Sequence, residues 1–184
     1  TKKKLVLIPS AYNHRAMGDV ENFIEYYKDE MDVYVITDRE MDGDEMIEDG
    51  VTYVRKGAKK ALYLEVTAEY IIDAGTISGT NKLSSTQKRI SVWHGTPYKK
   101  MFVDLAREHI ISGLDYASMF DLMVSPSAWY TEHFLRNSML YDGEVLETAI
   151  SRTDSLFLNE EEQQKIKKQI GIPEGKKVLL YAPT

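Results

Sequence analysis

The stretch that decides the fold is Leu5-Val6-Leu7-Ile8, a continuous apolar run that ends at Pro9. A short run without alternation is typical of a strand that is buried on both faces, as in a parallel sheet covered by helices. A polar loop follows, and apolar side chains then recur at helical spacing at Val20, Phe23, Ile24, Tyr27 and Met31. Strand, loop and helix in this order are the opening of a doubly wound α/β fold.

The same alternation continues along the chain. Further apolar runs predict strands at 33–36, 51–54, 70–72, 89–93, 120–124 and 144–146. Helical patterns or loops separate them, so we expect a mostly parallel, Rossmann-like sheet with helices on both faces. The acidic stretch 38–49 is expected to be a surface loop or a short exposed helix, and 77–88 a loop.

The end of the chain predicts a domain boundary. A highly charged helical pattern at 160–170 is followed by Gly171 and Pro173, which end helices. Residues 176–184 then predict one more strand. Because a strand needs a sheet to join, we expect one domain over 1–173, followed over 174–184 by a linker and the first strand of a second domain.

Composition excludes several classes of protein. The 184 residues are 43% hydrophobic, as in soluble globular domains, and 29 acidic against 23 basic residues argue against nucleic-acid binding. The absence of cysteine excludes thiolate metal sites, and the four histidines lack ligand spacing, so we expect no metal. Since no apolar run approaches the roughly 20 residues of a membrane span, we expect a cytoplasmic chain.

The richest chemistry lies in Trp93-His94-Gly95-Thr96-Pro97-Tyr98-Lys99. An imidazole, a glycine, a hydroxyl and an ammonium group follow a predicted strand, which suits binding and deprotonation of a polar, anionic substrate. Gly95 allows the backbone to approach a ligand closely. Pro97 is expected at the first position of a helix, with Thr96 as its cap or as a phosphate ligand.

Several predicted strands end in polar loops. In a parallel sheet these ends meet at one edge, where ligands bind. The candidate site residues on these loops are Asn13, His14, Arg15, His94, Thr96, Lys99, Ser125, Ser127, Arg152 and Asp154. His109 and His133 lie within helical patterns and are interpreted as structural, and the aromatic residues Trp129, Tyr130 and Phe134, with Met139, as core.

The motif at 93–99 resembles the W-H-G-T-P-x-K signature of the CDP-glycerol glycerophosphotransferases, which include the teichoic acid polymerases and primases of Gram-positive cell walls. The weaker motifs S-x-S at 125–127, R-x-D at 152–154 and Y-A-P-T at 181–184 follow in the order that this family shows. One departure is Ala149-Ile150-Ser151 before Arg152, where the family more often has G-x-P.

The resemblance implies the N-terminal, acceptor-side half of a GT-B fold, with most of the donor site in a C-terminal domain. The implied reaction passes glycerol phosphate, or a related polyol phosphate, from CDP-glycerol or another CDP-polyol to a lipid-linked polyol-phosphate or disaccharide acceptor. It implies no permanently bound cofactor, and an enzyme that is peripheral on the inner face of the cell membrane. The half alone is expected to be inactive.

His94 is the expected general base, since a neutral imidazole accepts a proton at neutral pH. The alternative is a histidine that ends a strand and hydrogen-bonds a carbonyl. Two other functions stay open: a GT-B glycosyltransferase that uses a nucleotide sugar, and a non-catalytic, flavodoxin-like binding module. Analysis of reaction products separates the two enzymes, and turnover separates both from the binding module.

Overall fold

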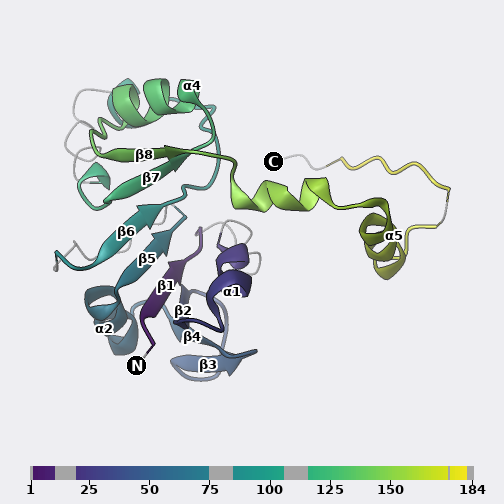
Figure 1. Cartoon of the computed structure of the whole chain (residues 1–184), viewed down its shortest axis with the longest axis horizontal. Helices are drawn as coiled ribbons and strands as arrows, with labels where there is room; N and C mark the ends of the chain where they lie inside the picture. Colours follow the sequence, from purple (N-terminus) through teal and green to yellow (C-terminus); the bar gives the residue numbers. More distant parts are fainter. Residues whose placement is uncertain (1, 11–19, 75–84, 106–115, 174, 182–184) are drawn as a thin grey trace. The chain divides into compact units, whose positions relative to one another are not determined.

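The computed structural model describes residues 2–10, 20–74, 85–105, 116–173 and 175–181. The chain forms two compact units, Thr1–Arg152 and Thr153–Thr184. The predicted domain boundary after residue 173 does not coincide with this division and stays a prediction. The first unit holds the sheet that organises the fold (Figure 1).

In the described part of the chain, one eight-stranded sheet has the order β3-β4-β2-β1-β5-β6-β7-β8. Neighbouring strands are parallel except β3 with β4. The strands are β1 Lys4–Ile8, β2 Asp32–Thr37, β3 Glu45–Glu48, β4 Val51–Arg55, β5 Tyr70–Asp73, β6 Lys88–Ser91, β7 Leu122–Ser125 and β8 Glu144–Glu147. The predicted mostly parallel α/β sheet is therefore confirmed.

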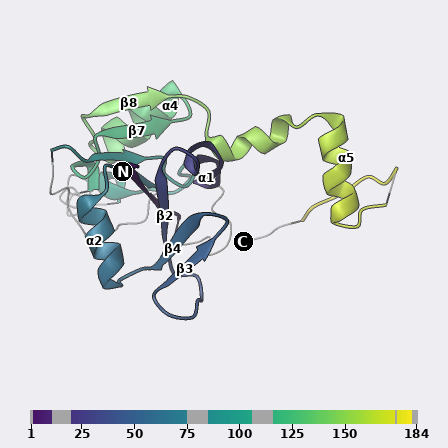
Figure 2. The same ribbon diagram turned by 60° about the horizontal axis from the view of Figure 1, so that its bottom comes forward.

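Helices cover both faces of the sheet around β1. Leu5 and Leu7 belong to the apolar cluster that contains Ile24 of α1 (Glu21–Tyr27), whereas Val6 and Ile8 belong to the cluster that contains Leu64 of α2 (Lys59–Thr67). Figures 1 and 2 show α1 and α2 on opposite sides of the strands. Because successive side chains of a strand point to opposite faces, an unbroken apolar run fits this doubly covered position.

The second half of the sheet is covered by α4 (Ala128–Tyr130) and the π-helix η3 (Thr131–Ser138), seen beside β7 and β8 in Figure 1. Tyr130, Phe134 and Met139 are buried in one cluster, as predicted. Trp129 is 58% exposed, so its prediction as a core residue is wrong. Ser127 caps this helix at its N-terminus, and Trp129 lies on the exposed face of the helix while Tyr130 lies on the buried one.

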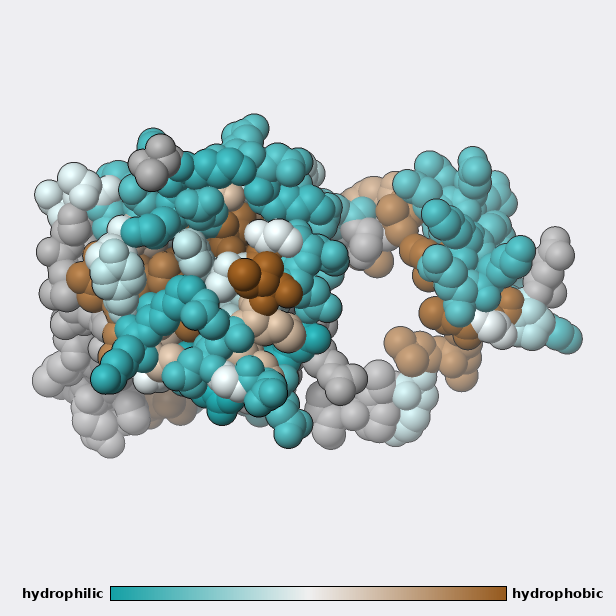
Figure 3. All heavy atoms as spheres, turned by 90° about the horizontal axis from the view of Figure 1, so that it is seen from below, coloured by the Kyte–Doolittle hydropathy of each residue, from teal (hydrophilic) through white to brown (hydrophobic). Residues whose placement is uncertain are grey.

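The acidic stretch 38–49 was expected to contain no strand, and the structure corrects this with β3. Asp49 and Gly50 have φ angles of 48° and 80°, the conformation that a tight hairpin turn requires. They fold β3 back on β4, with Glu48 opposite Val51. Figure 3 shows the surrounding face as largely hydrophilic around a small apolar patch, so the acidic side chains remain in contact with solvent.

A further expectation is wrong. No helix begins at Pro97, and the next helical turn is η1 (Phe102–Asp104). The intervening side chains offer no apolar stripe for burial, and Tyr98 is 84% exposed. In contrast, the strand predicted over 176–184 as part of a second domain stays a prediction: the described residues 176–181 form no strand within this chain, and Leu179 is 94% exposed.

The second unit is helical in its first part, up to Gln169. It contains most of η4 (Ser151–Phe157) and α5 (Glu160–Gln169). Asn159 and Glu162 cap α5 reciprocally, and Gly171 follows it with a φ of 74°. Among the helices that the structure describes, none combines the length and the apolar composition needed to cross a bilayer.

Candidate functional site

The carboxyl ends of the parallel strands meet at one edge of the sheet. The chain runs from β1 outward through β2 to β4 and then returns to β5 on the other side of β1. Ligands of open α/β sheets bind at the carboxyl ends of the strands, where the strand order reverses in this way. The strands that precede the predicted site loops therefore all end at the edge that the sequence pointed to.

The loop that carries His94 leaves β6 by an unusual backbone path. Trp93 has a φ of 53° and Gly95 a φ of 147°, both in the positive range that favours glycine. The Trp93 side chain is 7% exposed, and its ring lies 5.2 Å from that of Phe134 and 5.5 Å from that of Tyr116. Aromatic packing thus holds a strained residue directly before the histidine.

His94 lies half-buried on this aromatic base. Its ring stacks on Trp93 with a centroid distance of 4.4 Å and an interplanar angle of 26°. Its Nδ1 lies 3.2 Å from the carbonyl oxygen of Ala74, directly after β5. A carbonyl only accepts hydrogen bonds, so this contact places the proton on Nδ1 and the basic lone pair of the neutral ring on Nε2.

The contact with Ala74 is compatible with both interpretations of His94, the structural one and the catalytic one. The carbonyl bond that a purely structural histidine would make is present, and the same bond fixes the tautomer and the ring orientation that a general base needs. The geometry can thus present Nε2 as a proton acceptor at the edge of the sheet.

The remaining residues of the motif are more accessible. Thr96 is exposed and starts no helix, so its expected role as a cap is wrong. Lys99 is exposed, and its Nζ lies 5.2 Å from the centre of the Tyr98 ring. Gly95, between the histidine and these groups, has the backbone conformation described above. The motif therefore offers a hydroxyl and a cation to solvent beside a half-buried imidazole.

Ser125 and Ser127 have structural partners. Ser125 is fully buried, and its hydroxyl donates to the carbonyl oxygen of Ser127 at 2.9 Å and lies 2.8 Å from the Thr131 hydroxyl. The Ser127 side chain accepts a hydrogen bond from the backbone N–H of Tyr130, as an N-cap does. Their predicted role in substrate binding stays a prediction.

The structure does not test the other candidates. Asn13, His14 and Arg15 lie outside the described residues, as does His109. Arg152 lies in η4, and its side chain is also outside the described set. Asp154 is exposed in the second unit.

Sequence reasoning missed a buried polar layer beside the site. Arg89 is 2% exposed, and burial lowers its pKa, while Glu65, Asp73 and Asp121 oppose that shift. Ser91 lies opposite Asp73 in the register of β5 and β6. The sequence contained a sign of this layer, because Gln87, Arg89 and Ser91 occupy every second position and therefore share one face of the strand.

Tyr116 adds a second ionisable group to this layer. Burial raises its pKa well above the ordinary value, and the negative charge of Asp73 adds to the rise. The nearby Ser91 hydroxyl lowers the Tyr116 pKa in part. Among the described residues, however, no hydrogen bond of normal geometry joins the Ser91 and Tyr116 hydroxyls. Because the Tyr116 ring packs against Trp93, this layer supports the loop of His94.

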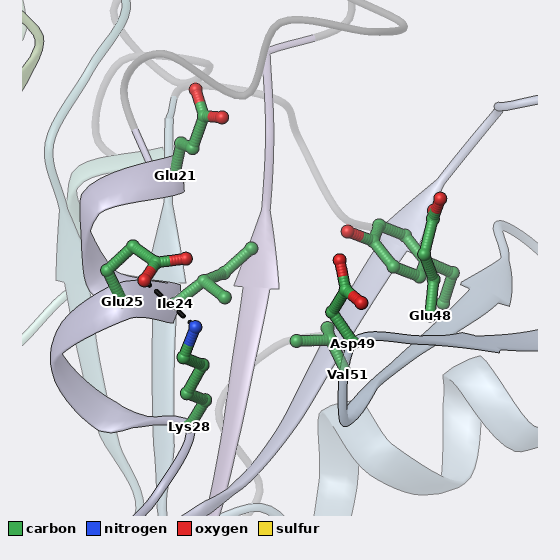
Figure 4. A pocket seen from close by; sticks show the side chains of 8 residues that line it. Glu21, Ile24, Glu25, Lys28, Glu48, Asp49 and Val51 are labelled. Carbon is green, nitrogen blue, oxygen red and sulfur yellow. Dashed lines mark hydrogen bonds and ion pairs between the residues drawn. The ribbon is translucent and has the colours of Figure 1, made fainter.

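The described residues of the first unit border hollows on two sides of the motif-bearing sheet. One, of about 350 Å³, is bordered by Pro97 and Lys99 of the motif. The other, of about 420 Å³, lies between α1 and the β3–β4 hairpin. Figure 4 shows its carboxylates, with Lys28 paired to Glu25 at 2.9 Å. Its four carboxylates against one ammonium group disfavour an anionic substrate, and no described group of acidic and histidine side chains could hold a metal ion.

Comparison with known proteins gives the family. The family described as CDP-Glycerol:Poly(glycerophosphate) glycerophosphotransferase matches residues 1–184. The chain belongs to this family. It is 29% identical over 174 residues to a teichoic acid poly(glycerol phosphate) polymerase of Bacillus spizizenii, covering 88% of this chain and 44% of that protein. It is 31% identical over 107 residues to a teichoic acid glycerol-phosphate transferase of Staphylococcus aureus, covering 52% and 28%.

Solved structures confirm the fold of this CDP-glycerol glycerophosphotransferase family member. A variant of the wall teichoic acid polymerase TagF soaked with CDPG superposes with a TM-score of 0.79 at 22% identity, covering 100% of this chain and 47% of that chain. A second TagF variant gives 0.73 at 18% identity, covering 95% and 46%. The GT-B type of Rossmann-like sheet is thus confirmed, and the chain spans less than half the length of these relatives.

Proposed function

We propose that this chain is the acceptor-side half of an enzyme that transfers glycerol phosphate, or a related polyol phosphate, from a CDP-activated donor. The observation that supports this most directly is the loop of His94. It carries the motif of the family, lies at the carboxyl edge of the sheet, and holds the imidazole with Nδ1 on a carbonyl. The donor-binding half would come from the second domain, for which the boundary after residue 173 is our proposal.

In the proposed reaction, Nε2 of His94 takes the proton of an acceptor hydroxyl. The acceptor oxygen then bonds to the phosphorus that carries glycerol, the bond between this phosphorus and the bridging oxygen of CMP breaks, and CMP leaves. The Ala74 carbonyl holds Nδ1–H throughout and stabilises the imidazolium that forms. General base catalysis of this kind contributes about 10²- to 10⁴-fold to a rate.

Phosphate charge would be met by cations of the same edge. Lys99 is exposed three residues beyond Thr96 and can reach an anion from the motif itself. We propose further substrate contacts for Gly95 and Thr96, and for Asn13, His14, Arg15, Arg152 and Asp154, on the basis of their sequence positions. The acceptor is proposed to be a lipid-linked polyol phosphate or disaccharide.

A lipid-linked acceptor requires that the whole enzyme reaches a membrane surface. We propose a peripheral contact with the inner face of the cell membrane, to which the basic start of the chain, Lys2 to Lys4, contributes positive charge. Flotation of the longer protein with anionic vesicles tests this point. Absence of binding at low salt would exclude it.

The function is tested by products. The protein extended through its second domain is supplied with an acceptor and an equal mixture of CDP-glycerol, CDP-ribitol and a nucleotide sugar, and the products are weighed by mass spectrometry. Addition of a glycerol phosphate or ribitol phosphate mass with release of CMP supports the proposal. Addition of a hexose would instead show a glycosyltransferase, and no turnover would favour a binding module.

A further inference from the structure

The smaller hollow is built from three segments that lie far apart in the sequence. It is lined by Pro97, Lys99, Asp104, Trp129, His133, Phe134, Asn137 and Ser138. Its volume of about 350 Å³ falls in the range of small-molecule sites. The motif loop forms one wall, η1 contributes a carboxylate, and α4 with η3 forms the other wall.

The base of this hollow is fixed to the protein core. Phe134 is 3% exposed and packs with its ring 5.2 Å from Trp93. Ser138 is buried, and its Oγ donates to the carbonyl oxygen of Met101 at 2.7 Å. Trp93, on which the His94 ring stacks, thus contacts the floor of the hollow, and Pro97 and Lys99 of the same loop line its wall.

The rim of the hollow carries exposed aromatic, charged and amide side chains. Trp129 is 58% exposed, and its ring lies 4.9 Å from that of His133. Lys99 and Asn137 are exposed on opposite walls, and Asp104 is exposed beside them. An indole face suits the C–H groups of a polyol, an ammonium group suits a phosphate, and amide and carboxylate groups suit hydroxyls.

The backbone around the hollow is also unusual. His133 and Asn137 belong to a π-helix of eight residues, a rare conformation that occurs frequently at functional sites. Phe102 lies two residues before Asp104 in the sequence and Leu140 two residues after Ser138, and their φ angles are 47° and 62°. Strained residues of this kind cluster where a ligand must be held.

From these observations we propose that the hollow binds one polyol phosphate unit of the acceptor, as a subsite next to His94. Lys99 contacts the phosphate, the indole of Trp129 covers the carbon chain, and His133 and Asn137 bind its oxygens. This assignment rests on the proposed function, since it takes the acceptor to be a polyol phosphate polymer. His133, interpreted from the sequence as structural, becomes a binding residue.

The chain contains its own reporter for this site. It has two tryptophans, of which Trp93 is 7% and Trp129 58% exposed. Acrylamide therefore quenches mainly Trp129, and a Trp129→Phe variant establishes its share of the signal. We expect a short glycerol phosphate oligomer to protect Trp129 from acrylamide, whereas glycerol and inorganic phosphate at equal concentration do not.

Matched variants identify the contacts. Lys99→Met is expected to weaken oligomer binding about 5- to 10-fold, as does His133→Ala, because each removes a hydrogen bond to a charged or polar ligand group. Lys100→Met, which removes a neighbouring exposed charge outside the hollow, is the control and leaves binding as it is. Circular dichroism verifies that each variant is folded.

Several outcomes would overturn the subsite. These are equal quenching with and without the oligomer, equal protection by glycerol or by inorganic phosphate, protection by anionic vesicles alone, and unchanged binding in both Lys99→Met and His133→Ala. The proposed function fails separately. If the extended protein transfers no polyol phosphate but the oligomer still protects Trp129, then the proposal of the subsite is supported and the proposal of the transfer reaction is rejected.

Discussion

The loops after β6 and β7 leave neighbouring strands at the same edge of the sheet, yet they use their polar groups in opposite ways. Ser91 and Met123 lie side by side in the register of the two strands. After β6 the backbone is strained, no helix follows directly, and His94 and Thr96 remain partly or fully exposed. After β7 the two serines hydrogen-bond within the turn and start a helix.

This difference shows that polar side chains at the carboxyl edge can stabilise a local turn as well as remain accessible to a ligand. A hydroxyl that caps a helix satisfies a backbone N–H that would otherwise lack a partner, so its removal lowers stability. A strained backbone conformation costs stability and persists only where its surroundings hold it, and such residues cluster at functional sites. The partners of each side chain therefore separate the two roles.

The largest effect is expected for His94→Ala in the protein extended through its second domain. Loss of the general base should lower the transfer rate about 10²- to 10⁴-fold, while the unfolding midpoint in urea changes little because the ring is only half-buried. Lys100→Ala is the control. Turnover close to that of the unaltered enzyme would remove His94 from the mechanism.

Gly95→Ala tests the backbone of the same loop. At a φ of 147° a side chain introduces strain of about 1–3 kcal/mol, and relief of that strain should move His94 and lower transfer. Gly57→Ala is matched, since Gly57 has a φ of 82° and open space around it. Both variants should lose stability in urea, and only Gly95→Ala should lose activity. Equal activity in the two would show that the loop geometry is not used.

Ser127→Ala tests the other loop. Loss of the cap should lower the free energy of unfolding by about 1 kcal/mol, measured by urea denaturation of the 184-residue chain. Ser127→Asp should restore most of it, because aspartate caps equally well. The transfer rate of the extended protein should fall far less than in His94→Ala. A fall of similar size would support the predicted role of Ser127 in substrate binding.

Alkaline pH gives the smallest expected effect. The pKa of Tyr116 is raised by burial above its unfolded value near 10. Its contribution to stability is thus complete below about pH 10 and is lost as the pH rises toward the folded pKa, since the unfolded chain then releases the proton first. Unfolding midpoints between pH 9 and 11 should fall as the pH rises, and less steeply in Tyr116→Phe. The same dependence of the unfolding midpoint on pH in the unaltered chain and in Tyr116→Phe would contradict a raised pKa of Tyr116.

Much of the sheet could be predicted from apolar runs. Leu5 to Ile8 gave β1 correctly, because burial on both faces leaves a simple pattern that requires no knowledge of distant contacts. β3 was missed because its strand depends on pairing with β4 and on a turn at Asp49 and Gly50, not on local hydrophobicity. The same reason explains the absent strand at 176–181, where the apolar pattern is present without a described partner.

The site was predictable in part. The motif located His94, and the parallel topology placed its loop at the expected edge of the sheet. The contact with Ala74 could not be foreseen, because it joins two strands that pair only in the folded sheet. The hollow beside His133 could not be foreseen for a related reason, since a helical spacing identifies a face but not whether that face is covered.

The position of β1 has a consequence for the way the chain acquires its structure. β1 is synthesised before the other strands, but it lies between β2 and β5, and its second neighbour emerges only after the β3–β4 hairpin and α2 have been made. Parallel pairings between distant segments form slowly, whereas a hairpin closes quickly. We therefore expect β3 and β4 to pair early. We expect one edge of β1 to remain unpaired during synthesis until β5 (Tyr70–Asp73) has been made.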